Sequence, residues 1–239
     1  MKKRLKKRLL DQATKPYART FFTNYFWARG KLGGDPIFPA LLDAKVFADG
    51  ARVLDLGCGR GLLAAWLLAA EKMAHDGLWP APHKPPRALQ FRGVELVARE
   101  VRCGNAALQA AHGDRVSLEV GDMRDAELSD VDAVTILDVL HYIPHEEQDR
   151  LLDRIRAALG SGGLFVTRVG DAAAGRRFRF SQKIDACMAA LQGHRSPPTW
   201  CRPLSEWQRV LEARGFSVQV LPMSRGTWFA NVMLICRVI

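Results

Sequence analysis

Three glycines at every second position follow a short apolar run in Val53-Leu54-Asp55-Leu56-Gly57-Cys58-Gly59-Arg60-Gly61. Gly57 and Gly59 let the backbone turn tightly and approach a ligand, since a Cβ at either position would clash or forbid a positive φ. Gly61 permits close packing of the helix that should follow, and the free N–H groups at the start of that helix suit a ligand carboxylate. A glycine-rich turn alone is a weak signal, because many α/β folds need one for structural reasons.

Acidic side chains accompany this turn at three places. Asp55 lies within the apolar run, Glu95 ends a second predicted strand, and Asp122 follows a third. Glu95 at a strand end can accept hydrogen bonds from two hydroxyl groups, and Asp55 can receive an ammonium group. The alternatives are a solvated carboxylate for Glu95 and a simple turn residue for Asp122. Turn and acids together favour a site for a small polar ligand.

The elements that must position these residues alternate between strands and helices. Short apolar runs predict strands, and apolar residues at i, i+4 and i+8 predict helices. Strands are expected at 51–56, before and including Glu95, and at 116–120, 131–137, 164–169, 216–221 and 231–238. Helices are expected from Pro36 through Leu42, at 62–73 and 99–111, from Pro144 up to Gly160, and at 180–191 and 205–214. The last one carries a capping-box pattern, Ser205 with Gln208.

Alternating strands and helices predict a doubly wound α/β sheet, mostly parallel, with its ligand site at the carboxyl ends of the strands. No strong helix separates 216–221 from 231–238, which indicates an antiparallel hairpin at the sheet edge. We expect residues 1–48 to form a basic arm and a helical cap, and residues 49–239 to form the main domain. Within that domain, 73–92 is expected to be a proline-rich insertion and 170–202 a segment that covers the substrate.

The sequence resembles the class I methyltransferases in three features. The motif Asp-x-Gly-x-Gly-x-Gly stands between a strand and a helix, an acidic residue ends the second strand, and Gly121-Asp122 follows the third. The resemblance covers about residues 50 to 170 and implies a Rossmann-like, seven-stranded methyltransferase domain. It implies S-adenosylmethionine as the cofactor, with Asp55 at its ammonium group, Glu95 at the ribose hydroxyls and Asp122 at the adenine amino group. The other cofactor-binding residues that it implies are Gly57, Cys58, Gly59, Gly61, Leu96, Met123 (against the adenine ring) and Asp138.

Asp138-Val139-Leu140-His141-Tyr142 follows the fourth predicted strand, where this family places residues that border the methyl group and the acceptor. Methyl transfer is an in-line displacement at carbon, so the enzyme mainly orients a nucleophile and needs a base only if the acceptor must lose a proton. His141 and Tyr142 are the candidate catalytic residues for that step. Packing or enclosure of the cofactor is the alternative for both, and Asp138 would fix the local turn or the cofactor.

Two rival functions follow from the same fold. A dinucleotide-dependent oxidoreductase would need glycine at position 62 for its G-x-G-x-x-G pattern, and Leu62 stands there. One departure from the expected pattern is the spacing of 40 positions between Asp55 and Glu95, whereas about 20 is typical between the turn and the ribose acid of dinucleotide folds; the proline-rich insertion accounts for the excess. A non-catalytic binding protein on this fold would not need all three acids.

The net charge of +10 is concentrated at the N-terminus, because residues 1–31 carry ten basic side chains against Asp11 alone. The other residues are therefore almost neutral. An RNA methyltransferase is the alternative function, in which the basic arm would bind RNA by electrostatic attraction. An RNA-binding track normally extends basic charge around the active site, so nucleic acid is the less favoured partner.

The arm, residues 1–31, has several interpretations. A helix at 2–13 would place Leu5, Leu9 and Ala13 on one stripe, which suits an anionic membrane surface but offers little apolar area for insertion. Aromatic rings interleave with cations from Tyr17 to Trp27, as in single-stranded nucleic-acid binding. A basic arm can also meet an acidic acyl carrier protein. A solvated leader followed by a packed aromatic cap is the favoured interpretation, on which deletion of residues 2–15 leaves folding nearly intact.

Aromatic side chains gather before and after the predicted core, namely Phe21, Phe22, Tyr25, Phe26, Trp27, Trp200 and Trp207. These two regions cover the acceptor in small-molecule methyltransferases, so the resemblance implies a hydrophobic, aromatic or polyene-like small-molecule acceptor, free or carrier-bound. The stretch from Trp27 to Pro36 also resembles methyltransferases of bacterial aryl polyene pigment clusters.

Five cysteines lie far apart and form no C-x-x-C pair, so neither a disulfide frame nor a metal site is expected. Apolar runs are shorter than the roughly 20 residues that cross a bilayer. Charged residues occupy the place where the apolar part of a signal peptide would follow the first lysines. These features predict a cytoplasmic protein, with attachment to the inner face of the membrane as a further option.

Overall fold

The computed structural model describes residues 1–20, 22–80, 84–175, 178, 199–223 and 230–239. Seven strands form one sheet in the order β3-β2-β1-β4-β5-β7-β6. The chain divides into two compact units, Met1–Val134 and Thr135–Ile239, and each is taken by itself below. Phe21, the helix expected at 180–191 and most of the substrate-covering segment expected at 170–202 lie outside the described residues.

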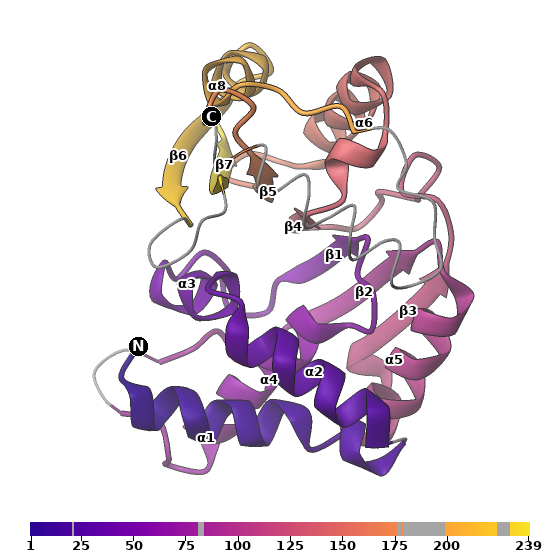
Figure 1. Cartoon of the computed structure of the whole chain (residues 1–239), viewed down its shortest axis with the longest axis vertical. Coiled ribbons are helices and arrows are strands. Elements are labelled where there is room, and N and C mark those ends of the chain that lie inside the picture. The colour runs from indigo at the N-terminus through magenta and orange to yellow at the C-terminus, as the bar shows by residue number, and fades with distance from the viewer. Residues whose placement is uncertain (21, 81–83, 176–177, 179–198, 224–229) are drawn as a thin grey trace. The chain divides into compact units, whose positions relative to one another are not determined.

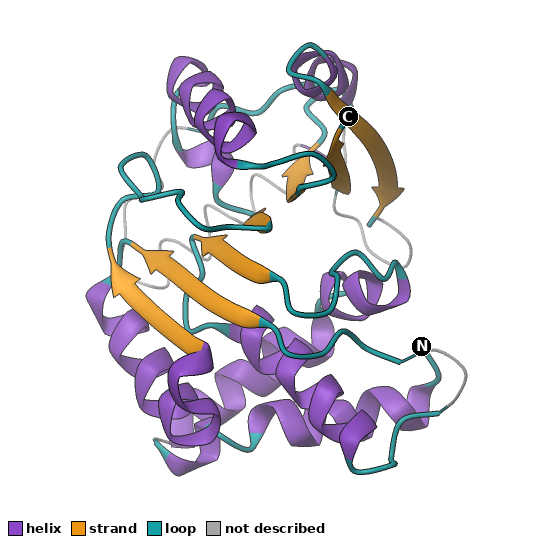
Figure 2. Cartoon of the chain, turned by 180° about the vertical axis from the view of Figure 1, so that it is seen from behind, coloured by secondary structure: helices purple, strands orange, loops and turns teal. Residues whose placement is uncertain are grey.

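The first unit places three parallel strands side by side. Its elements are α1 (Lys3–Thr14), η1 (Tyr17–Arg19), α2 (Phe22–Gly34), α3 (Ile37–Asp43), β1 (Arg52–Leu56), α4 (Leu62–His75), β2 (Gln90–Glu95), α5 (Ala98–His112), η2 (Gly113–Arg115) and β3 (Val116–Val120). β2 pairs in parallel with both β1 and β3, with Leu56 opposite Val94 and Glu95 opposite Val120. The carboxyl ends of these strands therefore meet at one edge, as Figure 2 shows from behind.

Helix α4 explains why the N-terminal helices are needed. Every residue from Leu62 to Ala70 is buried, and a helix that is apolar on all sides must be covered on all sides. Helix α1 contacts both α4 and α2, and Figure 1 shows α1 and α2 lying along α4. Leu9 and Ala13 of α1 are almost fully buried. The expectation of a solvated leader is therefore wrong, because the apolar stripe of the arm packs inside the unit.

The expected aromatic cap is only partly packed. Tyr17 is fully buried, whereas Phe22 is 78% exposed and Phe26 is 52% exposed. Tyr25 and Phe26 meet edge to face, with ring centroids 5.1 Å apart. Among its described residues, the aromatic stretch thus combines one buried anchor, Tyr17, with a surface cluster, which corrects the expectation of a packed cap.

In the second unit, an antiparallel pair of strands forms the sheet edge, as expected. Its elements are most of β4 (Ala133–Leu137), which runs across the division, then η3 (Leu140–Tyr142), α6 (His145–Ala158), β5 (Leu164–Gly170), α8 (Leu204–Glu212), β6 (Phe216–Pro222) and β7 (Asn231–Val238). β7 pairs antiparallel with both β5 and β6. Its central position explains the run of buried residues from Val232 to Cys236. Among the helices that the structure describes, none is long and apolar enough to span a membrane.

The capping box predicted at Ser205 is wrong. Helix α8 begins at Leu204, after Pro203 in an extended conformation. The N–H of Leu204 instead donates to Asp171 Oδ1 at 3.0 Å, and the same oxygen accepts from the N–H of Ala173 at 3.0 Å. A carboxylate from a distant loop therefore satisfies one of the unpaired donors at the start of the helix, so a local motif is not needed.

Candidate functional site

The glycine-rich turn between β1 and α4 has the backbone that the sequence requires. Gly57, Gly59 and Gly61 all have positive φ angles, of 75°, 55° and 72°. A Cβ on Gly61 would lie 2.6 Å from Leu108 Cδ1, so this glycine lets the start of α4 pack closely on α5. Among the described residues, a Cβ on Gly59 would meet no atom within 4 Å. The backbone at Gly59 therefore faces open space, which leaves room for a ligand to approach.

Glu95 connects the end of β2 to this turn. Its Oε2 accepts a hydrogen bond from the N–H of Gly59 at 3.0 Å, and its Oε1 accepts one from the N–H of Val97 at 2.9 Å. The N–H groups of Gly57 and Cys58 donate to the carbonyl oxygen of Val94, at 2.8 and 3.2 Å. The carboxylate is thus fixed in direction, and each of its oxygens keeps lone-pair capacity for a ligand hydroxyl.

Asp55 of β1 and Cys58 of the turn are both buried, with exposed fractions of 7% and 8%. Burial raises the pKa of the Cys58 thiol well above its usual value, and the negative charges of Asp55 and Glu95 raise it further. The thiol therefore stays protonated and is a poor nucleophile. Cys58 therefore contributes packing to the site, whereas the carboxylates of Asp55 and Glu95 contribute negative charge.

Asp122 follows β3 at the same edge. The N–H of Gly121 donates to the carbonyl oxygen of Glu95 at 3.1 Å, which ties the ends of β2 and β3 together. The carboxylate of Asp122 accepts a hydrogen bond from the backbone N–H of Arg124 at 2.9 Å and forms an ion pair with its guanidinium at 2.6 Å. The bonds to Arg124 lower the pKa of Asp122 below its usual value, so Asp122 is an ionised turn residue.

Apolar side chains border these acids. Leu96 is 69% exposed directly after Glu95, and Met123 is half-buried directly after Asp122. Exposed apolar side chains beside oriented polar groups are typical of a ligand site. The structure thus gathers nine of the predicted cofactor residues within the first unit; these are Asp55, Gly57, Cys58, Gly59, Gly61, Glu95, Leu96, Asp122 and Met123.

Arg60 is the residue of this turn that sequence reasoning missed. Its guanidinium is buried and forms a two-pronged ion pair with Glu100 of α5, at 2.6 Å from Nε and 2.9 Å from Nη2. Its Nη1 donates to Asn24 Oδ1 at 2.9 Å, and the guanidinium carbon lies 4.2 Å from the ring centroid of Trp27. The sequence does show an arginine between two glycines after a buried strand. It does not show the partners of this arginine, because they are distant along the chain.

The same residue also binds the cap through its backbone. The hydroxyl of Tyr17 donates to the carbonyl oxygen of Arg60 at 2.8 Å, and burial raises the pKa of Tyr17 so that this hydroxyl keeps its proton. Residues from η1, α2 and α5 therefore hold the turn through Arg60, while Glu95 holds it through the N–H of Gly59. The cap is part of the structure that fixes the glycine-rich turn.

The second unit contains the remaining predicted residues. Asp138 has a positive φ of 64° and forms an ion pair with the buried Arg168, whose Nε lies 2.6 Å from Asp138 Oδ1. This pair satisfies Arg168 and holds the turn after β4. The arrangement fits the predicted role of Asp138 in fixing the local turn, and a contact with a cofactor stays a prediction.

His141 and Tyr142 form a contact pair in η3, with ring centroids 4.2 Å apart. Burial lowers the pKa of His141, and the charge of Asp138 opposes this shift. Within the part of the chain that the structure describes, His141 Nε2 is buried and has no hydrogen-bond partner. A buried neutral imidazole with a nitrogen left over is equipped to take a proton.

The backbone of this segment is held rigidly. The N–H of Trp200 donates to the carbonyl oxygen of His141 at 2.8 Å. The amide of Gln148 donates to the carbonyl oxygens of Leu140, Ile143 and Trp200, at distances from 2.8 to 3.2 Å. Gln148 is itself fixed by the buried Arg202 at 3.1 Å. This polar network orders η3 and the backbone at Trp200 together.

Comparison with known proteins identifies relatives of the chain. A family model described as a methyltransferase domain matches residues 27–220. The chain is 26% identical over 140 residues to 3-amino-4-hydroxybenzoate 4-O-methyltransferase from Streptomyces cremeus, covering 59% of this chain and 34% of that protein. It is 28% identical over 118 residues to carboxy-S-adenosyl-L-methionine synthase from Chromohalobacter salexigens, covering 49% and 39%. The chain thus spans between a third and two fifths of the length of these curated relatives.

Solved structures share the fold at lower identity. Magnesium protoporphyrin IX methyltransferase from Synechocystis PCC 6803, with bound SAH, matches with a TM-score of 0.60 and 17% identity over 96% of this chain and 94% of that chain. The pyocyanin biosynthetic protein PhzM matches with a TM-score of 0.63 and 19% identity, over 93% and 61%. These matches agree with a Rossmann-like sheet that is mostly parallel and ends in antiparallel strands.

Proposed function

Because the chain belongs to this family of methyltransferase domains, we propose that it transfers a methyl group from S-adenosylmethionine to a hydrophobic small molecule that carries an aromatic or polyene-like group. The observation that carries the proposal is the Glu95 carboxylate, held by the N–H groups of Gly59 and Val97 beside a backbone that faces open space at Gly59. A fixed carboxylate at an open glycine-rich turn fits a ligand with neighbouring hydroxyl groups.

The residues of the first unit suit each part of the cofactor. Glu95 accepts the ribose hydroxyls, and the buried Asp55 receives the ammonium group. The first N–H groups of α4 face no intrahelical acceptor and suit the carboxylate. Asp122 accepts from the adenine amino group, while Leu96 and Met123 border the ring. S-adenosylmethionine, when bound, supplies an electrophilic methyl group on a positively charged sulfur.

For the acceptor, the residues of each unit are considered by themselves. His141 would take the proton of an acceptor hydroxyl, since its imidazole is neutral and its Nε2 is unpaired among the described residues. Tyr142, which is 39% exposed, would border the acceptor. Exposed Phe22 and Phe26 offer an aromatic surface. The Streptomyces relative is named for an aromatic hydroxyl acceptor, which supports the same class here.

Calorimetry with S-adenosylhomocysteine tests the cofactor half of the proposal. We expect micromolar binding by the wild type and a loss of about 1.5 to 3 kcal/mol in Glu95→Ala, the usual worth of hydrogen bonds to a charged group, which is about 10- to 150-fold in affinity. Glu95→Gln keeps an acceptor for the N–H of Gly59 and separates loss of charge from loss of the turn. Glu119→Ala, which removes an exposed carboxylate from β3, is the matched control. Equal losses in Glu95→Ala and Glu119→Ala would remove Glu95 from the site.

Transfer of a labelled methyl group tests the acceptor half. Separate reactions contain one of three acceptors, namely hydroxylated aromatic acids, an aromatic acid loaded on an acyl carrier protein, or RNA. The products are analysed by mass spectrometry. We expect label on the aromatic compounds, free or carrier-bound. Label on RNA alone would favour the alternative in which the exposed aromatics and cations of the N-terminal segment grip nucleic acid.

A further inference from the structure

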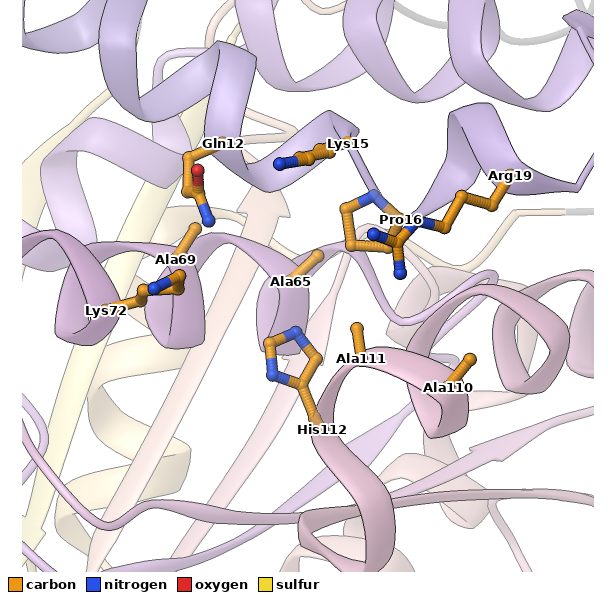
Figure 3. Close-up of a pocket in the computed structure, with 10 residues that line it drawn as sticks. All are labelled: Gln12, Lys15, Pro16, Arg19, Ala65, Ala69, Lys72, Ala110, Ala111 and His112. Atoms are coloured by element: carbon orange, nitrogen blue, oxygen red, sulfur yellow. The ribbon is translucent and has the colours of Figure 1, made fainter.

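A pocket lies in the first unit, and no residue of the glycine-rich turn lines it. It has a volume of about 210 Å³ and is formed where the end of α1 and η1 meet the middle of α4 and the end of α5. Figure 3 shows His112 rising from the end of α5, with Lys15 and Arg19 on the opposite wall. None of the predicted cofactor residues lines this pocket. Its contents would therefore be independent of the cofactor.

Alanines create the space. Ala65 and Ala69 of α4 and Ala110 and Ala111 of α5 line the pocket and contribute only methyl groups to its wall. Sites that enclose a whole ligand measure about 300 to 1,000 Å³, so a pocket of about 210 Å³ admits one small group. The rest of a larger molecule would remain outside.

The polar part of the wall is cationic. Lys15, Arg19, Lys72 and His112 line the pocket together with one amide side chain, and no carboxylate lines it. Lys72 Nζ is bound to Asp76 at 2.8 Å. Lys15 and Arg19 have no ion-pair partner within the described ranges of the chain. Two uncompensated cations that share a small cavity favour a compact anion, by Coulomb attraction and charge-assisted hydrogen bonds.

His112 adds a neutral donor. Burial lowers its pKa, the nearby Arg115 lowers it further, and Glu71 opposes both. A neutral imidazole still carries one N–H that can donate to an oxyanion. The pocket therefore combines a planar guanidinium fork, a primary ammonium and a ring N–H around one space.

We propose that this pocket binds a phosphate monoester group, carried either by a small soluble molecule or by a lipid headgroup. A phosphate monoester has three peripheral oxygens and a charge of about −1.5 to −2 at neutral pH, which matches the several donors and the two uncompensated cations. A planar carboxylate would leave part of this donor set unused. The wall of alanines accommodates the first carbons of the ester.

Titration with sodium phosphate at constant ionic strength, followed by amide NMR shifts, tests the site. We expect saturable shifts at Ala111 and His112. In the double variant Lys15→Ala/Arg19→Ala, affinity should fall about tenfold or more. The matched control, Lys7→Ala/Arg8→Ala, removes the same charge from exposed positions of α1 outside the pocket and should keep its affinity within about twofold. Equal losses in the two double variants would overturn the proposal, since they would indicate a diffuse basic surface.

A third variant removes space and keeps the charges. Ala111 is exposed, so Ala111→Trp should fold normally and fill the pocket, and it should abolish the saturable shifts. Phosphate binding that survives in folded Ala111→Trp would overturn the site. Circular dichroism verifies the fold of each variant.

Two further ligands identify the source of the phosphate. Tighter binding of glycerol 3-phosphate than of inorganic phosphate indicates a soluble ester. Co-sedimentation with vesicles of phosphatidic acid in phosphatidylcholine, lost in Lys15→Ala/Arg19→Ala but kept in Lys7→Ala/Arg8→Ala, indicates a lipid headgroup. The absence of saturable binding to inorganic phosphate, glycerol 3-phosphate and vesicles overturns the proposal.

Discussion

Arg60 shows how a single side chain can serve both stability and function. It lies between two glycines whose backbone must stay open for a ligand, and its own guanidinium is buried against Glu100, Asn24 and Trp27. A buried ion pair gains little over apolar packing, but the loss of one partner is costly because the other is left uncompensated. Movement of the turn away from α5 and the cap would break the Arg60–Glu100 pair and is therefore unfavourable in free energy.

We expect Arg60→Ala to lower the free energy of unfolding by about 3 to 5 kcal/mol, since it leaves Glu100 without its partner. Urea denaturation measures this change. Arg87→Ala breaks an exposed pair with Asp49 in the same unit and should leave the midpoint unchanged. If the two variants unfold at the same urea concentration, the buried pair does not stabilise the fold.

His141 determines an expected pH dependence. Because burial lowers its pKa below the usual value, the neutral form that can act as a base persists below pH 6.5. Methyl transfer to a hydroxyl acceptor should therefore fall only at more acidic pH, and His141→Gln should lower kcat by about 10²- to 10⁴-fold and abolish this acid limb. Stability depends on pH in the same direction. Because the pKa of His141 is lower in the folded protein than in the unfolded chain, its contribution to the free energy of unfolding is complete above pH 6.5 and is lost as the pH falls further. An acid limb that is unchanged in His141→Gln would exclude it as the base.

At the scale of elements, the start of α8 shows that a helix can be capped from a distance. The sequence offers Ser205 and Gln208 as a local capping box, yet the helix begins one residue earlier and Asp171 binds the N–H of Leu204. Asp171 also binds the N–H of Ala173 and so shapes its own turn. One carboxylate thereby orders the loop after β5 and the start of α8.

We expect Asp171→Ala to destabilise the protein by about 0.5 to 2 kcal/mol, the usual cost of losing a helix cap. Ser205→Ala should change stability by less than about 0.5 kcal/mol, since it removes no cap. Thermal unfolding of the two variants in parallel distinguishes these positions. A larger loss in Ser205→Ala than in Asp171→Ala would restore the local capping box.

For the whole molecule, the main feature is the asymmetry of charge and its structural consequence. Nearly all of the net charge of +10 lies in residues 1–31, yet this segment is not a detached tail. Its apolar residues cover α4, while Lys3, Arg4, Lys7 and Arg8 remain exposed. The arm can thus attract anionic partners through exposed charge without giving up the packing that the first unit needs.

Deletion of residues 2–15 should therefore destabilise the protein, which reverses the expectation from the sequence. The deletion removes Leu9 and Ala13 and exposes one side of α4; loss of one buried leucine side chain alone costs about 2 to 5 kcal/mol. We expect a lower melting temperature and weaker binding of S-adenosylhomocysteine, because the cap also holds the glycine-rich turn. Calorimetric scanning and ligand titration measure both. A deletion variant with the melting temperature of the full chain would show that α1 is dispensable.

Local features made much of the fold predictable. A strand, a glycine-rich turn and a helix are adjacent in the chain, and glycine permits the positive φ angles that Gly57, Gly59 and Gly61 adopt. Alternating strands and helices predicted the sheet, and the lack of a strong helix between 216–221 and 231–238 predicted its antiparallel edge. The strand ends placed Glu95 and Asp122 at one edge. The tertiary structure decided what depends on residues far apart: the partners of Arg60, the capping of α8 by Asp171, and the burial of α1 against α4. The stripe of Leu9 and Ala13 in α1 is visible in the sequence, but the sequence does not show which partner covers it, because packing brings such partners together only after the local elements have formed.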